Sequence, residues 1–238
     1  MTVGYKSLGF TIGLDLGQRV DQTADVVCEK LLPVAPESDT STWPSEYRVP
    51  FPEIIFVVRE LGRLPLGTDY VSAARAEAEV CHNVNCADYD HAPRLFVDAT
   101  GIGGPVIDSL ERFLPTGVTA VRVLWTSGAK LNRVGREWHV GKGRIVSRLQ
   151  ALIDTGRIQV PSTPEAQALL DELTSFEIKI TDSGTVVASA KSGAHDDLVM
   201  SLALCVIEDD APRIAYHRNL TWKPQDDWAD LHSSEGLW

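Results

Sequence analysis

The sequence predicts one α/β domain built on a central mixed sheet, in which three antiparallel strands are followed by parallel strands, with helices on both sides. Two observations predict this class. Three strand-like segments come first along the chain, and strand-like and helix-like segments alternate after them. The chain has 238 residues, 44% hydrophobic and 23% charged, which is enough to bury a substantial core.

The antiparallel strands are expected at residues 10–17, 24–34 and 54–64. The first, FTIGLDLG, is apolar and ends in a glycine turn, and the other two are rich in β-branched residues. Hairpin-type connections suffice for such a meander. Residues 33–52 contain five of the 13 prolines and are expected to form an exposed loop or insertion between the second and third strands.

The parallel part is expected to begin with a helix at residues 68–85, which is rich in alanine and has Thr68 as its N-cap. A buried-type strand follows at 94–98, a helix with proline in its first turn at 105–113, and another strand at 118–124. Strand, helix and strand at this spacing imply a right-handed crossover and a parallel pair.

Helices are also expected at residues 142–155, 164–176 and 196–207, with a hairpin at 177–190 between the last two. The first of them is amphipathic, with Arg144 and Arg148 on the side opposite its apolar stripe and therefore predicted to face solvent. The last is apolar on almost every side, which predicts burial. Residues 209–238 are acidic and contain tryptophan, so we expect a domain at 1–208 and a separate acidic tail at 209–238.

Several classes of protein are disfavoured. The longest apolar stretch, residues 198–207, is about half of what a bilayer span needs, and the N-terminus lacks a signal-peptide pattern. Four scattered cysteines are too few for a disulfide scaffold, so a reduced, cytosolic protein is expected.

The net charge of −11 argues against a nonspecific polyanion binder, but the charge is unevenly distributed. Residues 122–157 contain eight bases and two acids, a net charge of +6, so the remainder of the chain carries −17. On charge alone, this basic island is either a contact surface or a solvated helix face.

Acidic residues stand where an α/β fold places its ligands. Asp15 and Asp98 end two strands, and Asp196 and Asp197 open the most apolar helix. Each has a structural alternative, since Asp15 could begin a turn, Asp98 could cap a helix, and Asp196 or Asp197 could be an N-cap. Taken together, they predict a convergent oxygen-only cluster suited to Mg²⁺ or Mn²⁺.

Five segments carry a family resemblance: IGLDLG, DQTAD, VDATGIGGPVIDSL, GKGRIVSRLQALIDTGRIQVP and SGAHDDLVMSLALCV. Over about residues 9–207 the chain resembles the nuclease domain of the large terminase subunit of tailed bacteriophages. The VDATG and HDDLV blocks are the specific ones, whereas IGLDLG alone is weak. The resemblance implies a ribonuclease H-like fold and a metal-dependent endonuclease that cuts concatemeric viral DNA during genome packaging.

The resemblance also implies roles for individual residues. Asp15 would bridge two Mg²⁺ or Mn²⁺ ions, Asp98 would be the second metal ligand, and Asp197 or Asp196 the third. His195 would lie beside these ligands or be a weak ligand itself, and Lys142 would lie near the scissile strand. The catalytic set is then Asp15, Asp98, Lys142, His195, Asp196 and Asp197. The island would contact DNA phosphates through Lys130, Arg133, Arg136, Lys142, Arg144 and Arg148.

The family further implies double-stranded DNA as substrate, a terminase ATPase domain, a portal and a small terminase subunit as partners, no membrane association, and the host cytoplasm as location. The sequence has no G-x-x-x-x-G-K-[ST] loop, so the ATPase is expected on a separate chain or to have been removed. Two alternatives stay open: an actin-like or sugar-kinase-type ATPase domain, whose first phosphate turn IGLDLG also resembles, and a non-catalytic DNA-binding module of a packaging motor.

Two further patterns carry less weight. The spacing of Cys81, His82, Cys86 and His91 matches no standard zinc finger, so zinc is disfavoured. Trp125 and Trp138 flank the basic loop, and packing in the core is favoured over stacking on bases.

Overall fold

The computed structural model describes residues 4–17, 21–34, 53–86, 92–101, 104–127, 130–180, 186–190 and 195–208. Most of the expected proline-rich loop, the turn of the 177–190 hairpin and the acidic tail lie outside these residues, so the predicted division at residue 208 is not tested. Within the described parts, no helix is long and apolar enough to cross a membrane.

Among the described residues, an eight-stranded mixed sheet forms the centre of the fold, in the order β6-β7-β5-β4-β1-β2-β3-β8. The predicted meander is confirmed, because β1, β2 and β3 pair antiparallel. The predicted parallel part is also confirmed, because β1 pairs with β4, and β4 with β5, in parallel. The strands are β1 (Gly4–Asp15), β2 (Ala24–Val34), β3 (Ile55–Arg63), β4 (Arg94–Asp98), β5 (Thr119–Thr126), β6 (Leu131–Val134), β7 (Glu137–Gly141) and β8 (Ile158–Gln159).

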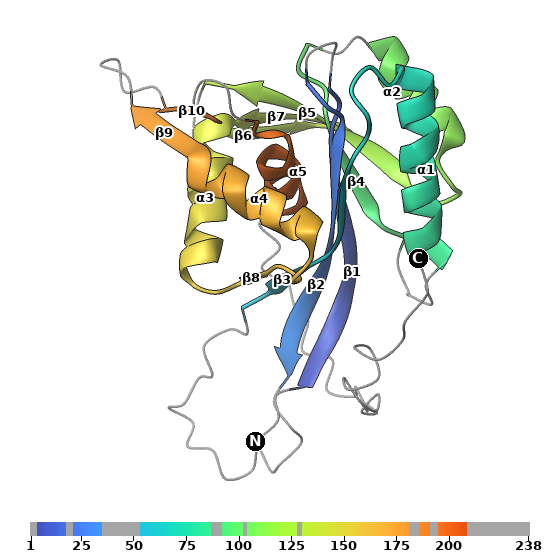
Figure 1. The fold of residues 1–238 in the computed structure, drawn as a ribbon. Helices are drawn as coiled ribbons and strands as arrows, with labels where there is room; N and C mark the ends of the chain where they lie inside the picture. The colour runs from blue at the N-terminus through green and yellow to red at the C-terminus, as the bar shows by residue number, and fades with distance from the viewer. Residues whose placement is uncertain are drawn as a thin grey trace.

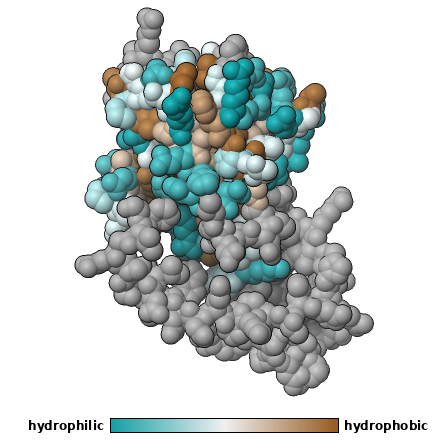
Figure 2. All heavy atoms as spheres, turned by 90° about the vertical axis from the view of Figure 1, so that its right-hand side faces the viewer, coloured by the Kyte–Doolittle hydropathy of each residue, from teal (hydrophilic) through white to brown (hydrophobic). Residues whose placement is uncertain are grey.

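Helices cover both faces of this sheet (Figure 1). One face carries α1 (Tyr70–Cys86) and α2 (Gly104–Phe113), and the other carries α3 (Lys142–Asp154), α4 (Pro164–Ser175) and α5 (Asp197–Cys205). A separate two-stranded sheet, β9 (Phe176–Ile180) with β10 (Val186–Ala190), is the expected hairpin. Seen from the α1 and α2 side, hydrophobic residues are interspersed among hydrophilic ones (Figure 2).

The predicted burial of α5 is confirmed, since every residue from Asp197 to Cys205 is buried. A glycine lets this helix approach the sheet closely. A Cβ atom on Gly13 in β1 would lie 1.9 Å from the backbone oxygen of Ser201 in α5. Gly13 therefore lets the middle of α5 lie against the strand that ends in Asp15.

Local expectations need three corrections. The N-cap of α1 is Asp69 rather than Thr68: the Asp69 carboxylate accepts hydrogen bonds from the backbone N–H groups of Val71 and Ser72, both at 3.0 Å. Ile145, Val146, Leu149 and Leu152 on the predicted apolar stripe of α3 are buried, but Ile153, the fifth residue of that stripe, is 41% exposed. The basic segment after β5, expected as a loop, contains the hairpin β6–β7.

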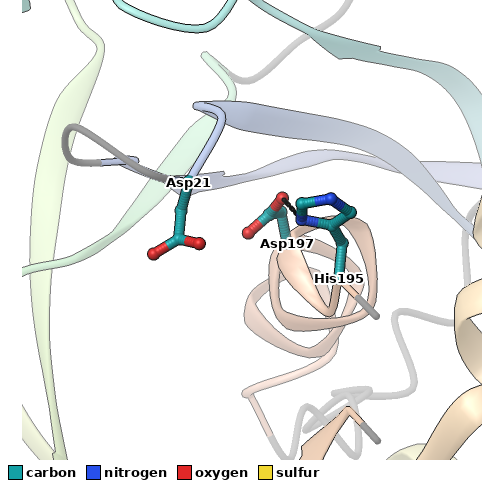
Figure 3. A group of neighbouring side chains, drawn as sticks. All are labelled: Asp21, His195 and Asp197. Atoms are coloured by element: carbon teal, nitrogen blue, oxygen red, sulfur yellow. Dashed lines mark ion pairs between the residues drawn. The ribbon is translucent and has the colours of Figure 1, made fainter. Parts of the chain in front are cut away.

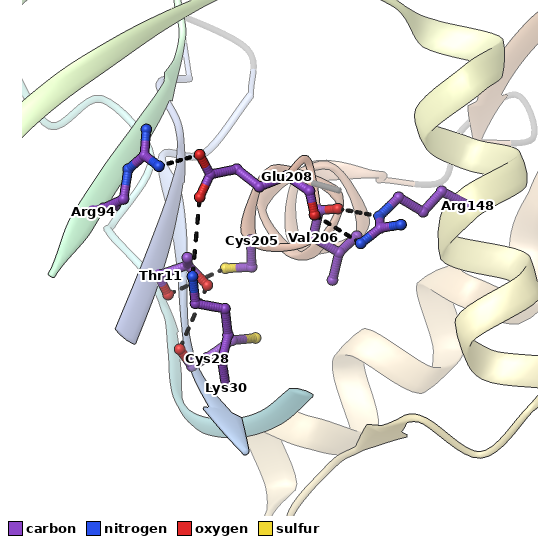
Figure 4. A network of polar contacts seen from close by, with 8 residues as sticks. All are labelled: Thr11, Cys28, Lys30, Arg94, Arg148, Cys205, Val206 and Glu208. Atoms are coloured by element: carbon purple, nitrogen blue, oxygen red, sulfur yellow. Dashed lines mark hydrogen bonds and ion pairs between the residues drawn. The ribbon is translucent and has the colours of Figure 1, made fainter. Parts of the chain in front are cut away.

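The prediction that Arg148 faces solvent is wrong. Its guanidinium donates hydrogen bonds to the backbone oxygens of Val206, at 2.6 Å, and Glu208, at 2.7 Å (Figure 4). Glu208 also forms ion pairs with Arg94 and Lys30. Arg148 thus satisfies carbonyl groups that the end of α5 leaves without helical partners. This engagement removes it from the surface predicted to contact DNA.

Candidate metal centre

The acids predicted from the sequence line one hollow of about 260 Å³ at the carboxyl ends of β1 and β4. The parallel register pairs Leu14 with Val97, so Asp15 and Asp98 follow directly on neighbouring strands. The lining consists of Asp15, Leu16, Gly17, Asp21, Asp98, Lys142, Asp196, Asp197 and Met200. The topology thus brings together side chains from the starts of α3 and α5 and the ends of two strands.

Asp15 is the most strongly perturbed of these acids. Burial is the largest cause that raises the pKa of its carboxyl well above the usual value, and the charges of Asp98, Asp197 and Asp196 raise it further. The ammonium of Lys142 opposes them. Burial, together with several carboxylates in one small space, produces this raised pKa, which is common at functional sites.

Asp98 is held by hydrogen bonds to both of its carboxylate oxygens. The backbone N–H of Thr100 donates to Oδ1 at 2.8 Å, and the indole N–H of Trp125 donates to Oδ2 at 2.7 Å. Burial raises the pKa of Asp98, whereas these donors and Lys142 lower it. The Thr100 bond is a local turn, so the alternative that Asp98 caps α2 does not describe its position.

The beginning of α5 is capped by a residue from another helix. Glu172 of α4 accepts hydrogen bonds on Oε2 from the backbone N–H groups of Leu198, at 2.9 Å, and Val199, at 3.1 Å, and pairs with Arg63. Asp196 occupies the N-cap position but forms no capping hydrogen bond through its side chain. The N-cap alternative therefore does not explain either aspartate.

Asp197 lies between two further side chains in Figure 3. Its Oδ2 is 3.7 Å from Nδ1 of the exposed His195, and ligand atoms of Asp21, His195 and Asp197 lie within 4.8 Å of one another. Burial is the main cause that raises the pKa of Asp197; Arg63 and His195 lower it, and Asp21 and Asp196 raise it.

The sequence reasoning missed Asp21. It belongs to the DQTAD segment, one of those that carry the resemblance, but no role was predicted for it. Asp21 lies directly beside Gly17: a Cβ on Gly17 would lie 2.3 Å from the backbone oxygen of Asp21. The two glycines of GLDLG, with an aspartate shortly after them, are the sequence signal that could have identified Asp21.

This arrangement fits divalent cations. The hollow holds five aspartates and one lysine, a formal charge of −4 when all carboxylates are ionised, which two divalent ions would balance. Asp197 Oδ2 is buried and has no hydrogen-bond partner among the described residues. A buried carboxylate oxygen without a donor is costly unless a cation meets it. Oxygen donors in this number suit Mg²⁺ or Mn²⁺.

The predicted DNA-binding residues differ in where they lie. Lys142 lines the hollow, and Lys130, Arg133, Arg136 and Arg144 are exposed. The backbone oxygen of Lys130 accepts a hydrogen bond from the backbone N–H of Gly141 at 2.9 Å, which places Lys130 beside the start of α3.

The two tryptophans play different parts. Trp138 is buried, as favoured from the sequence, with its ring 5.4 Å from Phe96 and the Arg133 guanidinium 4.0 Å above it. Trp125 packs against the same core and also binds Asp98. Of the disfavoured zinc set, Cys81 is buried and His82 exposed, and the side chains of Cys86 and His91 lie outside the described residues.

Comparisons with known proteins agree with the family resemblance found in the sequence. The large terminase subunits of Thermus phage G20c and Thermus virus P23-45 are each 26% identical to this chain over 161 residues, which is 60% of this chain and 29% of each relative. The chain thus matches less than a third of the length of these curated relatives. No protein-family model matches the chain.

Solved structures are similar over most of the chain. The large terminase nuclease of the thermophilic phage G20c superposes with a TM-score of 0.53 at 20% identity, covering 84% of this chain and 82% of that one. The same nuclease with bound magnesium gives 0.52 at 24% identity, covering 83% and 79% respectively, and the form with bound cobalt gives the same values. The predicted resemblance is therefore confirmed: the chain has the ribonuclease H-like fold of the large terminase nuclease domains.

Proposed function

We propose that this chain is a metal-dependent endonuclease that hydrolyses phosphodiester bonds of double-stranded DNA. The convergence of Asp15, Asp98, Asp196, Asp197 and Asp21 with Lys142 around one hollow carries the proposal. The names of the similar proteins support it, since they are large terminase nucleases and one was solved with magnesium.

Asp15, Asp98 and Asp197 would hold the cations, with Asp15 between two of them and Asp21 and Asp196 at the rim. Two such ions, when bound, would activate water and stabilise the leaving 3′-oxygen. His195 touches Asp197 rather than the centre of the hollow, so it would steady that carboxylate or act as a weak ligand. The aspartates themselves repel phosphate and bind the scissile group only through cations.

Lysine and arginine side chains of the protein would hold the DNA. The positively charged side chain of Lys142 lines the hollow and is close enough to Asp15 and Asp98 to lower the pKa of both. Three more basic residues, Lys130, Arg133 and Arg136, lie along the edge strand β6 and the turn after it, which lead away from the site. We call these three residues the basic row. Arg136 pairs with Glu111 at 3.5 Å, but an exposed pair of this kind is weak and can yield to phosphate. Such contacts position the duplex without reading its sequence.

The wider role follows from the relatives rather than from this site. We propose that cleavage serves the packaging of concatemeric viral DNA in the host cytoplasm, together with a terminase ATPase domain, a portal and a small terminase subunit. The matched segment is 29% of each curated relative, which leaves ample length there for an ATPase.

Cleavage of supercoiled plasmid tests the proposed activity. Wild type should convert the plasmid to nicked and linear forms with Mn²⁺ or Mg²⁺ and not with EDTA. Asp98→Asn should lose at least about a hundredfold in rate, because it removes a charged ligand while keeping the side-chain volume. Asp171→Asn, an exposed acid on α4, is the matched control and should cleave like wild type. Cleavage by Asp98→Asn at the wild-type rate would exclude this site.

Binding measured against salt tests the basic row. Reversing Arg133 and Arg136 to glutamate should reduce the slope of log K against log salt by about 0.9 for each lost phosphate contact. Reversing Lys6 and Arg75, which are exposed on β1 and α1, changes the net charge equally and should leave a steeper slope. Equal slopes for the two variants would show that the row does not face DNA.

A further inference from the structure

Trp125 touches a predicted metal ligand without being one. It lies on β5, where Val123 pairs with Asp98, so Trp125 is two residues further along on the same face of the sheet. Its indole N–H donates to Asp98 Oδ2 at 2.7 Å. Its backbone N–H donates to Thr100 Oγ1 at 2.9 Å, and the Thr100 backbone N–H donates to Asp98 Oδ1 at 2.8 Å. The two bonds of Trp125 link β5 to the segment at the end of β4, and the Thr100 bond to Asp98 is local to that segment.

The two bonds to Asp98 fix the plane of its carboxylate. Each carboxylate oxygen has two lone-pair directions, and one direction on each oxygen is used by a donor from the chain. The Thr100 side chain also hydrogen-bonds this carboxylate, and the lone-pair directions that these donors leave unused are available to a cation. A charge-assisted bond of 2.7 Å is short and strong for an indole donor, and it favours the ionised carboxylate that a metal requires.

We propose that Trp125 is a positioning residue, whose indole N–H holds the Asp98 carboxylate in the orientation that binds the divalent ion. The inference rests on the proposed function, since it assigns Asp98 as a metal ligand. Hydrogen-bonding groups around metal ligands generally contribute 10–100-fold to affinity or activity. Packing against the core is the competing explanation for Trp125, because its ring also contacts the cluster that includes Phe96 and Trp138.

Removing only the N–H separates the two explanations. Trp125→Phe keeps an aromatic ring but loses the donor, and β-(3-benzothienyl)alanine at position 125 keeps the bicyclic shape with sulfur in place of N–H. Trp138→Phe is the matched control, because Trp138 is buried at 4% exposure in the same cluster and lies over Phe96 and under Arg133. It should lower the melting temperature without changing the response to metal.

The readout is the Mn²⁺ concentration that gives half of the maximal thermal stabilisation, with the Mn²⁺ dependence of plasmid cleavage measured in parallel. Both Trp125 variants should need about tenfold more Mn²⁺ than wild type in both assays, and Trp138→Phe should match wild type. Should Trp125→Phe fail to fold, the benzothienyl variant decides. Wild-type Mn²⁺ midpoints in the benzothienyl variant would overturn the proposal and leave the nuclease intact. A wild type that neither binds Mn²⁺ nor cleaves DNA would overturn the proposed function and this inference with it.

Discussion

Replacing Asp15 by asparagine should make the metal-free protein more stable while abolishing cleavage. Asp15 ends β1 among acids that raise its pKa: burial acts first, then the charges of Asp98, Asp197 and Asp196, against Lys142. With all carboxylates ionised the hollow carries a formal charge of −4, and asparagine reduces this to −3 at nearly constant volume.

The sign of the effect depends on pH. Because the folded-state pKa of Asp15 is raised, the unfolded state is the more acidic one. Below the ordinary aspartate pKa of 3.8, Asp15 therefore does not lower the free energy of unfolding of the wild type. As the pH rises from 3.8 through the raised pKa, the wild type loses stability. The advantage of Asp15→Asn should be absent at pH 3 and complete well above the raised pKa.

Metal should stabilise wild type more than Asp15→Asn. An ion that binds only the folded state contributes about 2.7 kcal/mol at a hundredfold excess over its dissociation constant. For a domain of this size that corresponds to about 5–11 °C in melting temperature. Wild type should show this increase with Mn²⁺, and Asp15→Asn should show less than half of it. Differential scanning calorimetry of both proteins, with and without Mn²⁺, measures all four values. A variant that melts below metal-free wild type, with no metal response in either protein, would refute the reasoning.

Three other changes test separate parts of the account. Gly13→Ala places a Cβ 1.9 Å from the Ser201 oxygen, so urea unfolding should show a loss of at least about 1–3 kcal/mol, and a wild-type midpoint would contradict the close approach of α5. Asp25→Asn should remove a loss of stability between pH 4 and 6, at most roughly 3 kcal/mol, because burial and the charge of Glu60 raise the pKa of Asp25 to about 6; an unchanged stability–pH curve would contradict this. Arg148→Ala should cost about 1.5–3 kcal/mol by calorimetry because it deprives two carbonyls of a charged donor, whereas Gln150→Ala at an exposed position of α3 should cost within about 0.5 kcal/mol; equal costs would argue against the role of Arg148 at the end of α5.

The features predicted correctly from the sequence are those encoded in local patterns. The meander follows from three consecutive strand-like segments, two of them rich in β-branched residues, and the burial of α5 follows from a helix that is apolar on almost every side. The gathering of Asp15, Asp98 and Asp197 was predictable because strand ends and a helix start have fixed places in a parallel sheet.

The features that were missed depend on contacts between distant segments. Arg148 was placed in solvent by its position on α3, but the end of α5 lies where its guanidinium reaches. Glu172 caps α5 from 26 residues before Leu198, and nothing in the local sequence marks it as a cap. Asp21 reaches the site because it lies beside Gly17, and β6–β7 offers too few apolar residues to be recognised as a hairpin.

The central claim is that these acids form one metal centre, and diffraction at the manganese absorption edge from crystals soaked in Mn²⁺ tests it most directly. We predict anomalous peaks between Asp15, Asp98 and Asp197, within bonding distance of the buried Oδ2 of Asp197 that lacks a hydrogen-bond partner among the described residues. No peak in this hollow at saturating Mn²⁺, or peaks only beside the separate acids Asp25, Glu60 and Glu77, would contradict the account.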